Sequence, residues 1–382
     1  MRAWPTLVLI DPAGYVIGAV AGEGHGGALE EQIGELITAH RAAGTLREGP
    51  GPTATPDGAG GSLLAFPGKV AVDTAGGRLA IADSGHHRVV LADLAGTIRA
   101  VAGAGKPGAA DGSFADAAFR HPQGLAFHEG HLYVADTENH LIRRLDPATG
   151  GVETVAGTGQ QAHGPVRPDA GGPLATSLNS PWDLVVLQGV LYIAMAGCHQ
   201  VWGLHLTGGR LELVCGTGRE ALIDGMRLDA AMNQPSGITT DGALLYVADS
   251  EASAIRSIDP RPGGRIRTLV GVGLFDFGDR DGSGEGVRLQ HPLGLAVQDG
   301  RIYIADTYNH KIKVLFPSLQ RVETLFGTGR PGSAEGDRPQ FFEPGGLAAA
   351  PGRLYIADTN NHRICVADLS SKIVTALSLQ GA

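Results

Sequence analysis

Short apolar segments that each end in a polar turn recur along most of the chain. The clearest copy is Leu132 to Ala135, followed by Asp136, and similar segments end at residues 83, 195, 249, 306 and 358. The intervals between successive ends are 53, 59, 54, 57 and 52 residues. A repeat with a period of about 50 residues is typical of propellers, solenoids and similar arrays.

The second repeat, which runs from about Asp111 to Gly159, predicts four strands. They cover residues 124–127, 132–135, 141–145 and 152–156, and turn residues separate them. The 132–135 segment is apolar at every position, so we expect both faces of the sheet to be covered. No repeat contains an amphipathic segment of helical length, which leaves neighbouring sheets as the cover.

We therefore predict an all-β fold, a six-bladed β-propeller of four-stranded antiparallel blades around a central channel. A single four-stranded sheet of this size is marginal in water, so the stacking of blades is expected to stabilise each one. The sequence leaves two ways to close the ring. Residues 372–377 complete their own blade, or a strand is exchanged between the termini.

Several motifs recur at matching offsets within the repeats. They are Pro-x-Gly-Leu/Ile-Ala, Leu-Tyr-Val/Ile-Ala-Asp-Thr/Ser, Asn-His-x-Ile and Thr-Val/Leu-x-Gly-x-Gly. Together they resemble the NHL repeat over about residues 57–379. That family is six-bladed, in agreement with the count of repeats, and some of its propellers are lyases or hydrolases with a metal in the channel.

The first 45 residues do not follow the repeat. They predict a strand at 6–10, a strand at 15–20 and an amphipathic helix from about 27 to 41. Trp4-Pro5-Thr6 and the apolar strand after it resemble the second half of a thioredoxin-like domain, in which a proline before the third strand is cis and faces the redox site. The fragment is thus a small ββα unit that resembles the C-terminal half of a thioredoxin fold.

The expected organisation has three parts. Residues 1–45 form the partial thioredoxin-like segment, residues 46–56 form a linker rich in proline and glycine, and residues 57–382 form the propeller. A thioredoxin-like domain followed by NHL repeats is seen in one group of bacterial and animal proteins. The redox cysteines of that family lie in the first half of the domain, and this chain begins after that point, so one alternative is a fragment of a longer redox protein whose Cys-x-x-Cys half is missing.

Composition narrows the choice of function. The 382 residues carry 30 basic and 39 acidic side chains and a net charge of −9, which argues against nucleic acid as a partner. No apolar run reaches the roughly 18 residues of a membrane span, and no secretion signal is recognised, so we expect no membrane association and a cytoplasmic location. The three cysteines are scattered and are expected to be free thiols.

Histidines stand at one equivalent position in five repeats, and Ser253 takes that position in the sixth. The histidines are His87, His140, His199, His310 and His362. Equivalent positions in different blades are spread around a ring, so a role in the blade is favoured over a shared metal site. His121 and His291 likewise belong to opposite blades. The aspartates that end the apolar segments are expected to accept hydrogen bonds from the backbone amides that follow them.

Breaks in the repeat pattern give the candidate site. The glycine that begins the innermost strand is replaced by Lys69 in the first repeat and by Asp183 in the third. A lysine and an aspartate two blades apart are expected to face a common ligand at the channel mouth, with Trp182 and Gln123 beside the glycine position. Met195 and Cys198 also break the pattern in the third repeat, so drift of a single repeat remains the alternative.

The leading hypothesis is a non-catalytic propeller that binds a protein or small ligand at the channel mouth through Lys69, Gln123, Trp182 and Asp183. No Ser-His-Asp order, Gly-x-Ser-x-Gly or His-Glu-x-x-His motif is present, and we assign no catalytic residue, metal ligand or cofactor. A metal-assisted lyase or hydrolase with its site in the channel is the second hypothesis.

Overall fold

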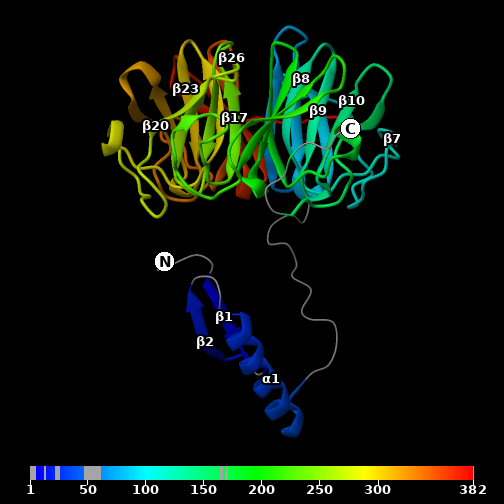
Figure 1. Ribbon diagram of the computed structural model, residues 1–382, viewed down its shortest axis with the longest axis vertical. Helices are drawn as coiled ribbons and strands as arrows, with labels where there is room; N and C mark the ends of the chain where they lie inside the picture. The colour runs from blue at the N-terminus through cyan, green and yellow to red at the C-terminus, as the bar shows by residue number, and fades with distance from the viewer. Residues whose placement is uncertain are drawn as a thin grey trace. The chain divides into compact units, whose positions relative to one another are not determined.

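The structure, a computed structural model, describes residues 6–12, 14–21, 26–46, 62–163, 167 and 171–381. The chain divides into two compact units, Met1–Gly60 and Gly61–Ala382. Trp4, Pro5 and all of the expected linker except Leu46 lie outside the described residues. The second unit is an all-β six-bladed propeller, as predicted (Figure 1).

Each blade is an antiparallel sheet whose first strand is innermost. Blade 1 contains β3 (Pro67–Asp73), β4 (Arg78–Asp83), β5 (Arg88–Asp93) and β6 (Ile98–Ala102). Blade 2 contains β8 (Pro122–His128), β9 (His131–Asp136), β10 (Leu141–Asp146) and β11 (Gly151–Ala156). Blade 3 contains β12 (Pro181–Leu187), β13 (Val190–Met195), β14 (Gln200–His205) and β15 (Leu211–Cys215).

The remaining blades repeat this order. Blade 4 contains β17 (Pro235–Thr240), β18 (Leu245–Asp249), β19 (Ala254–Ile258) and β20 (Arg265–Val270). Blade 5 contains β22 (Pro292–Gln298), β23 (Arg301–Asp306), β24 (Lys311–Phe316) and β25 (Arg321–Phe326). Blade 6 contains β26 (Pro344–Ala350), β27 (Arg353–Asp358), β28 (Arg363–Asp368) and β29 (Val374–Ala376).

Within the described residues, three blades carry a short fifth strand that the sequence did not predict. It comes from the lead-in loop, the segment that connects each blade to the next, and pairs with the outermost strand of the blade. These strands are β7 (Gly112–Ser113), β16 (Gly225–Met226) and β21 (Gly282–Ser283). The aspartate before each one fixes it, as Asp111 does by accepting hydrogen bonds from the backbone and hydroxyl of Thr154.

The core lies between blades, because both faces of the second strand are buried. In β9, Leu132 and Val134 pack in a cluster shared with blade 1, while Tyr133 and Ala135 pack in one shared with blade 3. The uninterrupted apolar pattern therefore has the cause inferred from the sequence. The last blade is completed by its own strand, because β29 pairs with β28. The residues after β29 continue to blade 1, where Gln380 forms a parallel bridge with Thr97, accepts a hydrogen bond from Ile98 and donates one to Gly96.

Single 3-10 turns connect the second and third strands at the channel-mouth face, the end of the ring at which the innermost strands begin. They are η1 (Ser84–His86), η2 (Thr137–Asn139), η4 (Ala196–Cys198), η6 (Thr307–Asn309) and η8 (Thr359–Asn361). Further single turns are η3 (Pro173–Ala175), η5 (Gly284–Gly286) and η7 (Pro317–Leu319). The first set carries the Asn and His positions of the repeat.

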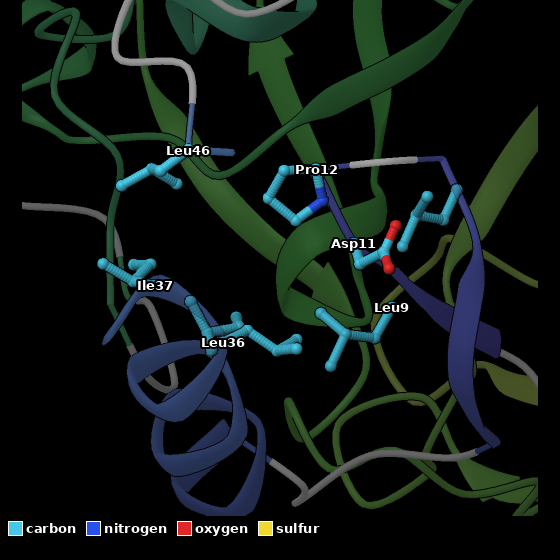
Figure 2. Close-up of a pocket in the computed structure, with 8 residues that line it drawn as sticks. Leu9, Asp11, Pro12, Leu36, Ile37 and Leu46 are labelled. Atoms are coloured by element: carbon cyan, nitrogen blue, oxygen red, sulfur yellow. The ribbon is translucent and has the colours of Figure 1, made fainter. Parts of the chain in front are cut away.

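The described residues of the first unit form β1 (Thr6–Ile10), β2 (Val16–Ala21) and α1 (Gly26–Ala42). The order ββα and the element bounds agree with the sequence prediction to within one residue. A groove of about 290 Å³ separates the helix from the hairpin and is lined by Leu9, Leu36 and Ile37 (Figure 2). Apolar side chains of this unit remain open to solvent, with Ile10 57% and Val16 65% exposed.

Candidate functional site

Close approach between neighbouring innermost strands explains the glycines of the repeat. A Cβ atom added to Gly124 would lie 2.5 Å from Cα of Asp183 in the next blade. At Gly237 the obstacle is the Leu293 carbonyl at 2.6 Å, and at Gly346 it is Cα of Lys69 at 2.7 Å. Backbone atoms cannot move aside as a flexible side chain does, so these positions require glycine.

Lys69 crosses the channel instead of facing solvent. Its amine donates hydrogen bonds to the carbonyl of Ser236 at 2.9 Å and to the carbonyl of Leu293, in blades 4 and 5. The same amine lies 3.4 Å from the carboxylate of Asp183 in blade 3, and the two side chains are only 4% and 10% exposed. The sequence predicts that Lys69 and Asp183 face a common ligand; in the structure the two side chains contact each other directly.

Both charges are affected by burial. Burial lowers the pKa of the Lys69 amine and raises the pKa of the Asp183 carboxyl, while the attraction between them opposes each change. Asp183 also accepts backbone hydrogen bonds from Leu184 at 2.9 Å and from Ile238 of blade 4 at 3.1 Å. We call Lys69, Asp183 and their four hydrogen-bonded partners the cross-channel brace.

Trp182 and Gln123 lie beside this brace with unused polar groups. Both side chains are half-buried, and no described protein group hydrogen bonds with the Trp182 indole or the Gln123 amide. The Gln123 side chain lies over Gly68, where an added Cβ atom would come 1.9 Å from its amide oxygen. A half-buried indole and a free amide next to a channel are suited to hold a ligand.

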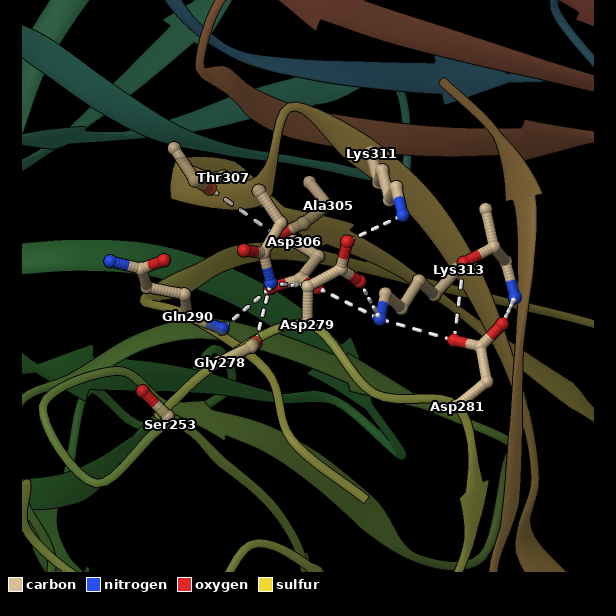
Figure 3. Close-up of polar contacts among 12 residues, drawn as sticks. Ser253, Gly278, Asp279, Asp281, Gln290, Ala305, Asp306, Thr307, Lys311 and Lys313 are labelled. Atoms are coloured by element: carbon tan, nitrogen blue, oxygen red, sulfur yellow. Dashed lines mark hydrogen bonds and ion pairs between the residues drawn. The ribbon is translucent and has the colours of Figure 1, made fainter. Parts of the chain in front are cut away.

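The strand-end aspartates have a structural role, but the expected donors were wrong. Each accepts a hydrogen bond from a lead-in amide 16 to 18 residues upstream, as Asp306 does from Gln290 at 2.7 Å. Its other oxygen accepts from Asn309 at 2.8 Å and lies 3.4 Å from Lys313 (Figure 3). Burial raises the pKa of Asp306 to about 6. The aspartate thus ties the lead-in loop to the blade, and does not bind the amides that follow it.

Blade 3 replaces this polar network with apolar groups. Met195 stands for the aspartate and Cys198 for the asparagine, and both are buried. Trp202, fully buried, occupies the position of the basic residues Arg143 and Arg256 that pair with the aspartate in blades 2 and 4. The aspartate, the asparagine and the basic residue are all replaced in this blade, so none of the three is left buried without its partners. Burial raises the pKa of Cys198 to about 12, which makes the thiol unreactive.

Two sets of hydrogen bonds join successive blades at the channel-mouth face. In the first, the hydroxyl after the strand-end aspartate donates to the carbonyl of the next blade's proline, as Thr137 does to Pro181 at 2.7 Å. Blade 3 has Ala196 at this position, and there the bond from Ile238 to Asp183 joins blades 3 and 4. In the second set, the repeat histidine accepts a backbone hydrogen bond from the next blade, as His140 does from Ser180 at 3.1 Å.

The repeat histidines therefore have a role in the blade, as inferred from their spacing. The described residues contain no group of three or more His, Cys, Asp or Glu side chains placed to hold a metal ion. In the same residues, no helix has the length and apolarity needed to cross a membrane.

The fold and its motifs define an NHL-repeat β-propeller, and comparison with known families agrees. The NHL repeat matches residues 64–90, 119–145, 289–315 and 341–367, which fall in blades 1, 2, 5 and 6. Blades 3 and 4, whose turns depart from the Asn-His motif, lie outside the matched ranges. The chain thus carries NHL repeats on a six-bladed propeller.

Curated relatives extend the similarity over the whole chain. NHL repeat-containing protein 2 of Gallus gallus is 40% identical over 423 residues, which cover 99% of this chain and 57% of the relative. Protein SUPPRESSOR OF QUENCHING 1, chloroplastic, of Arabidopsis thaliana is 42% identical over 409 residues, covering 100% of this chain and 38% of the relative. The chain thus spans about half or less of the length of these relatives.

Solved structures share the fold at low identity. A putative phosphatase from Bacteroides thetaiotaomicron gives a TM-score of 0.56 at 16% identity and covers 79% of this chain and 70% of its own. A catalytically inactive virginiamycin B lyase from Staphylococcus aureus with quinupristin gives 0.51 at 13% identity and covers 82% and 85%. At such identities the likeness concerns the propeller architecture.

Proposed function

We propose that this propeller is a non-catalytic binding module that engages a protein or small ligand at its channel mouth. The observation that carries the proposal is the pair Trp182 and Gln123, whose polar groups have no partner among the described residues although both side chains are half-buried. Aromatic surface combined with a few free polar groups is typical of recognition sites.

The cross-channel brace supports a site at the mouth rather than inside the channel. The Lys69 amine is occupied by Ser236, Leu293 and Asp183, and the side chain spans the channel from blade 1 to blades 4 and 5. A ligand that entered along the axis would have to break these contacts. Lys69 and Asp183 then support the site, while Trp182 and Gln123 contact the ligand.

Affinity capture from native host extract tests the proposal. Trp182→Ala and Gln123→Ala are compared with the wild type and with Leu319→Ala, a change at an exposed residue on the opposite end of blade 5. We expect a partner, or a small molecule seen by native mass spectrometry, that is retained by the wild type and Leu319→Ala and lost from the other two. Equal retention by all four proteins, or substrate turnover without a partner, contradicts the proposal.

A metal-assisted lyase or hydrolase in the channel is the alternative that this experiment distinguishes. Metal analysis of the purified protein separates the two, because stoichiometric zinc or calcium that is lost on substitution of channel residues would support catalysis. No arrangement of described residues favours it over binding.

For the first unit, we propose half of a thioredoxin-like domain on residues 1–45, joined by a linker at 46–56 to a propeller at 57–382. The exposed apolar side chains support this, because β1 is apolar from Leu7 to Ile10 and such continuous apolar strands are usually covered on both faces. A hairpin and one helix also supply too little core to be stable alone. The coding sequence upstream of codon 1 provides the test, since an in-frame Cys-x-x-Cys segment there is expected.

A further inference from the structure

Five of the six joints between blades contain the same histidine hydrogen bond. Nδ1 of each repeat histidine accepts the backbone N–H of the residue before the next blade's proline. The pairs are His87 with His121, His140 with Ser180, His199 with Gln234, His310 with Glu343, and His362 with Phe66, at 3.0 to 3.2 Å. We call each of these a histidine clasp.

The backbone around each clasp is in an unusual conformation. His140 has φ of 54° and Ser180 has φ of 48°, and every histidine and every donor residue in the set likewise has positive φ. Non-glycine residues adopt this left-handed conformation rarely and at a cost. The clasp is therefore a defined feature of the joint, held by the surrounding structure.

A clasp fixes the protonation state of its histidine. The backbone N–H is a permanent donor, so Nδ1 must present its lone pair, and the ring proton must lie on Nε2. When the ring takes up a second proton, Nδ1–H points at the backbone N–H and the hydrogen bond is lost. Four of the five donor amides take part in partly buried hydrogen bonds, and loss of the acceptor there destabilises the joint; the Gln234 amide at His199 is exposed.

The joint between blades 4 and 5 uses a group that does not titrate. Ser253 replaces the histidine there, and its hydroxyl accepts the backbone hydrogen bond of His291 at 3.3 Å. We propose that the channel-mouth face of the ring is pH-sensitive, so that acidification releases the five histidine clasps and leaves the serine joint closed. The chain thus contains an internal control for the effect of protonation.

Charged neighbours shift the pKa values of the clasp histidines in both directions. Burial lowers the pKa of His87, His140, His199 and His310, which resists protonation. Acidic groups oppose this effect, and basic groups add to it at two clasps. The acidic groups are Glu138 near His87 and His140, Glu220 and Glu251 near His199, and Glu343 and Asp358 near His310; the basic groups are Arg120, His86 and His121 near His87, and His163 near His140.

The clasps lie next to the residues of the proposed site. The donor amide of Ser180 is two residues before Trp182, and the donor amide of His121 is two residues before Gln123. Release of these amides would loosen the segments that position both side chains. This consequence for ligand binding rests on the proposed function, whereas the clasps themselves do not depend on it.

Residue-resolved amide exchange of the whole chain at pH 7.5 and pH 5.5, corrected for the intrinsic rate, tests the proposal. We expect the protection factors of the five donor amides to fall once the pH is below about 6.5, the usual pKa of a free histidine side chain, by about tenfold for each further pH unit. The His291 amide should keep its protection. Equal protection of all six amides at both pH values, or equal loss at all six, overturns the proposal.

Two substitutions of His140 separate loss of the acceptor from titration. In His140→Asn, the side-chain oxygen takes the place of Nδ1, and asparagine tolerates the left-handed backbone. The Ser180 amide should then be protected at both pH values, whereas His140→Leu should leave it unprotected at both. If the Ser180 amide of His140→Asn still loses protection at pH 5.5, the histidine is not the switch. These exchange results do not depend on whether any ligand binds.

Discussion

Single backbone contacts at the channel explain why four blades keep a glycine and two do not. Gly124, Gly237, Gly294 and Gly346 each face a neighbouring strand so closely that a Cβ atom would lie 3.0 Å or less from backbone atoms. At the two remaining positions the side chains of Lys69 and Asp183 turn into the channel and pair with each other. The space available at each position therefore determines the residue type.

Gly124→Ala should destabilise the propeller by about 1–3 kcal/mol, because the new Cβ atom meets Cα of Asp183 at 2.5 Å. The matched control is Gly286→Ala, where an added Cβ atom has no neighbour within 4 Å. That change should be neutral or slightly stabilising. Chemical denaturation of both variants measures the difference, and equal stability would show that the strands can move apart without cost.

Lys69→Met should cost about 3–5 kcal/mol, since it leaves the Asp183 carboxylate buried without its cation. Adding Asp183→Asn removes that charge, so the double variant should be less destabilised than the sum of the single variants by about 1–3 kcal/mol. A double-mutant cycle in the free energy of unfolding provides the measurement. Additive effects would mean that the pair does not interact across the channel.

At the scale of the element, local sequence predicted the strands, but not the contacts that join distant segments. The apolar pattern placed β9 and β10 within one residue, because burial on both faces leaves a signature within a few positions. The two-residue strands such as β7 carry no such signature. The donors to the strand-end aspartates were wrongly predicted, because they lie 16 to 18 residues upstream and are brought close only by the fold.

The residues of the candidate site could be predicted from the sequence, but the contacts that they make could not. Comparing repeats pointed to Lys69 and Asp183, because a residue that breaks a sixfold pattern is visible without a structure. The direct ion pair and the contacts to Ser236 and Leu293 depend on the width of the channel, which no single repeat specifies. Trp182 and Gln123 remain candidates for ligand binding.

The apolar interior of blade 3 can be tested by restoring the polar residues of the other blades. Met195→Asp restores the residue found in the other blades, but Trp202 now stands where a basic partner is needed. A buried carboxylate without a cation should cost about 3–5 kcal/mol, and adding Trp202→Arg should recover part of that loss. Met195→Leu, which preserves volume, should cost less than about 1.5 kcal/mol. Denaturation midpoints test these values. If Met195→Asp left the stability unchanged, water would have to reach the interior of blade 3.

On the scale of the whole molecule, stability depends on joints that repeat around the ring, so titration of one residue type acts at several places. Burial lowers the pKa of His310 below its usual value of 6.5, so the folded state binds fewer protons there than the unfolded state. Stability from this group is present above pH 6.5 and is lost as the pH falls. Asp136 and Asp306 act in the opposite direction, because their pKa values of about 6 favour protonation in the fold.

The wild type should therefore lose more thermal stability between pH 7.5 and pH 6 than His310→Asn does. The aspartates contribute equally to both proteins and cancel in the comparison. Differential scanning calorimetry at the two pH values measures the difference in Tm. An identical pH dependence would show that the His310 clasp remains closed after protonation.

We propose that the channel mouth, around Trp182, is the binding surface. Site-specific photocrosslinking tests it most directly, with a photoreactive phenylalanine analogue placed at position 182 in one protein and at the exposed position 319 in another. We predict crosslinks to a partner or small ligand from position 182 and none from position 319. Crosslinks from position 319 alone would contradict the account and place the binding surface at the opposite end of the ring.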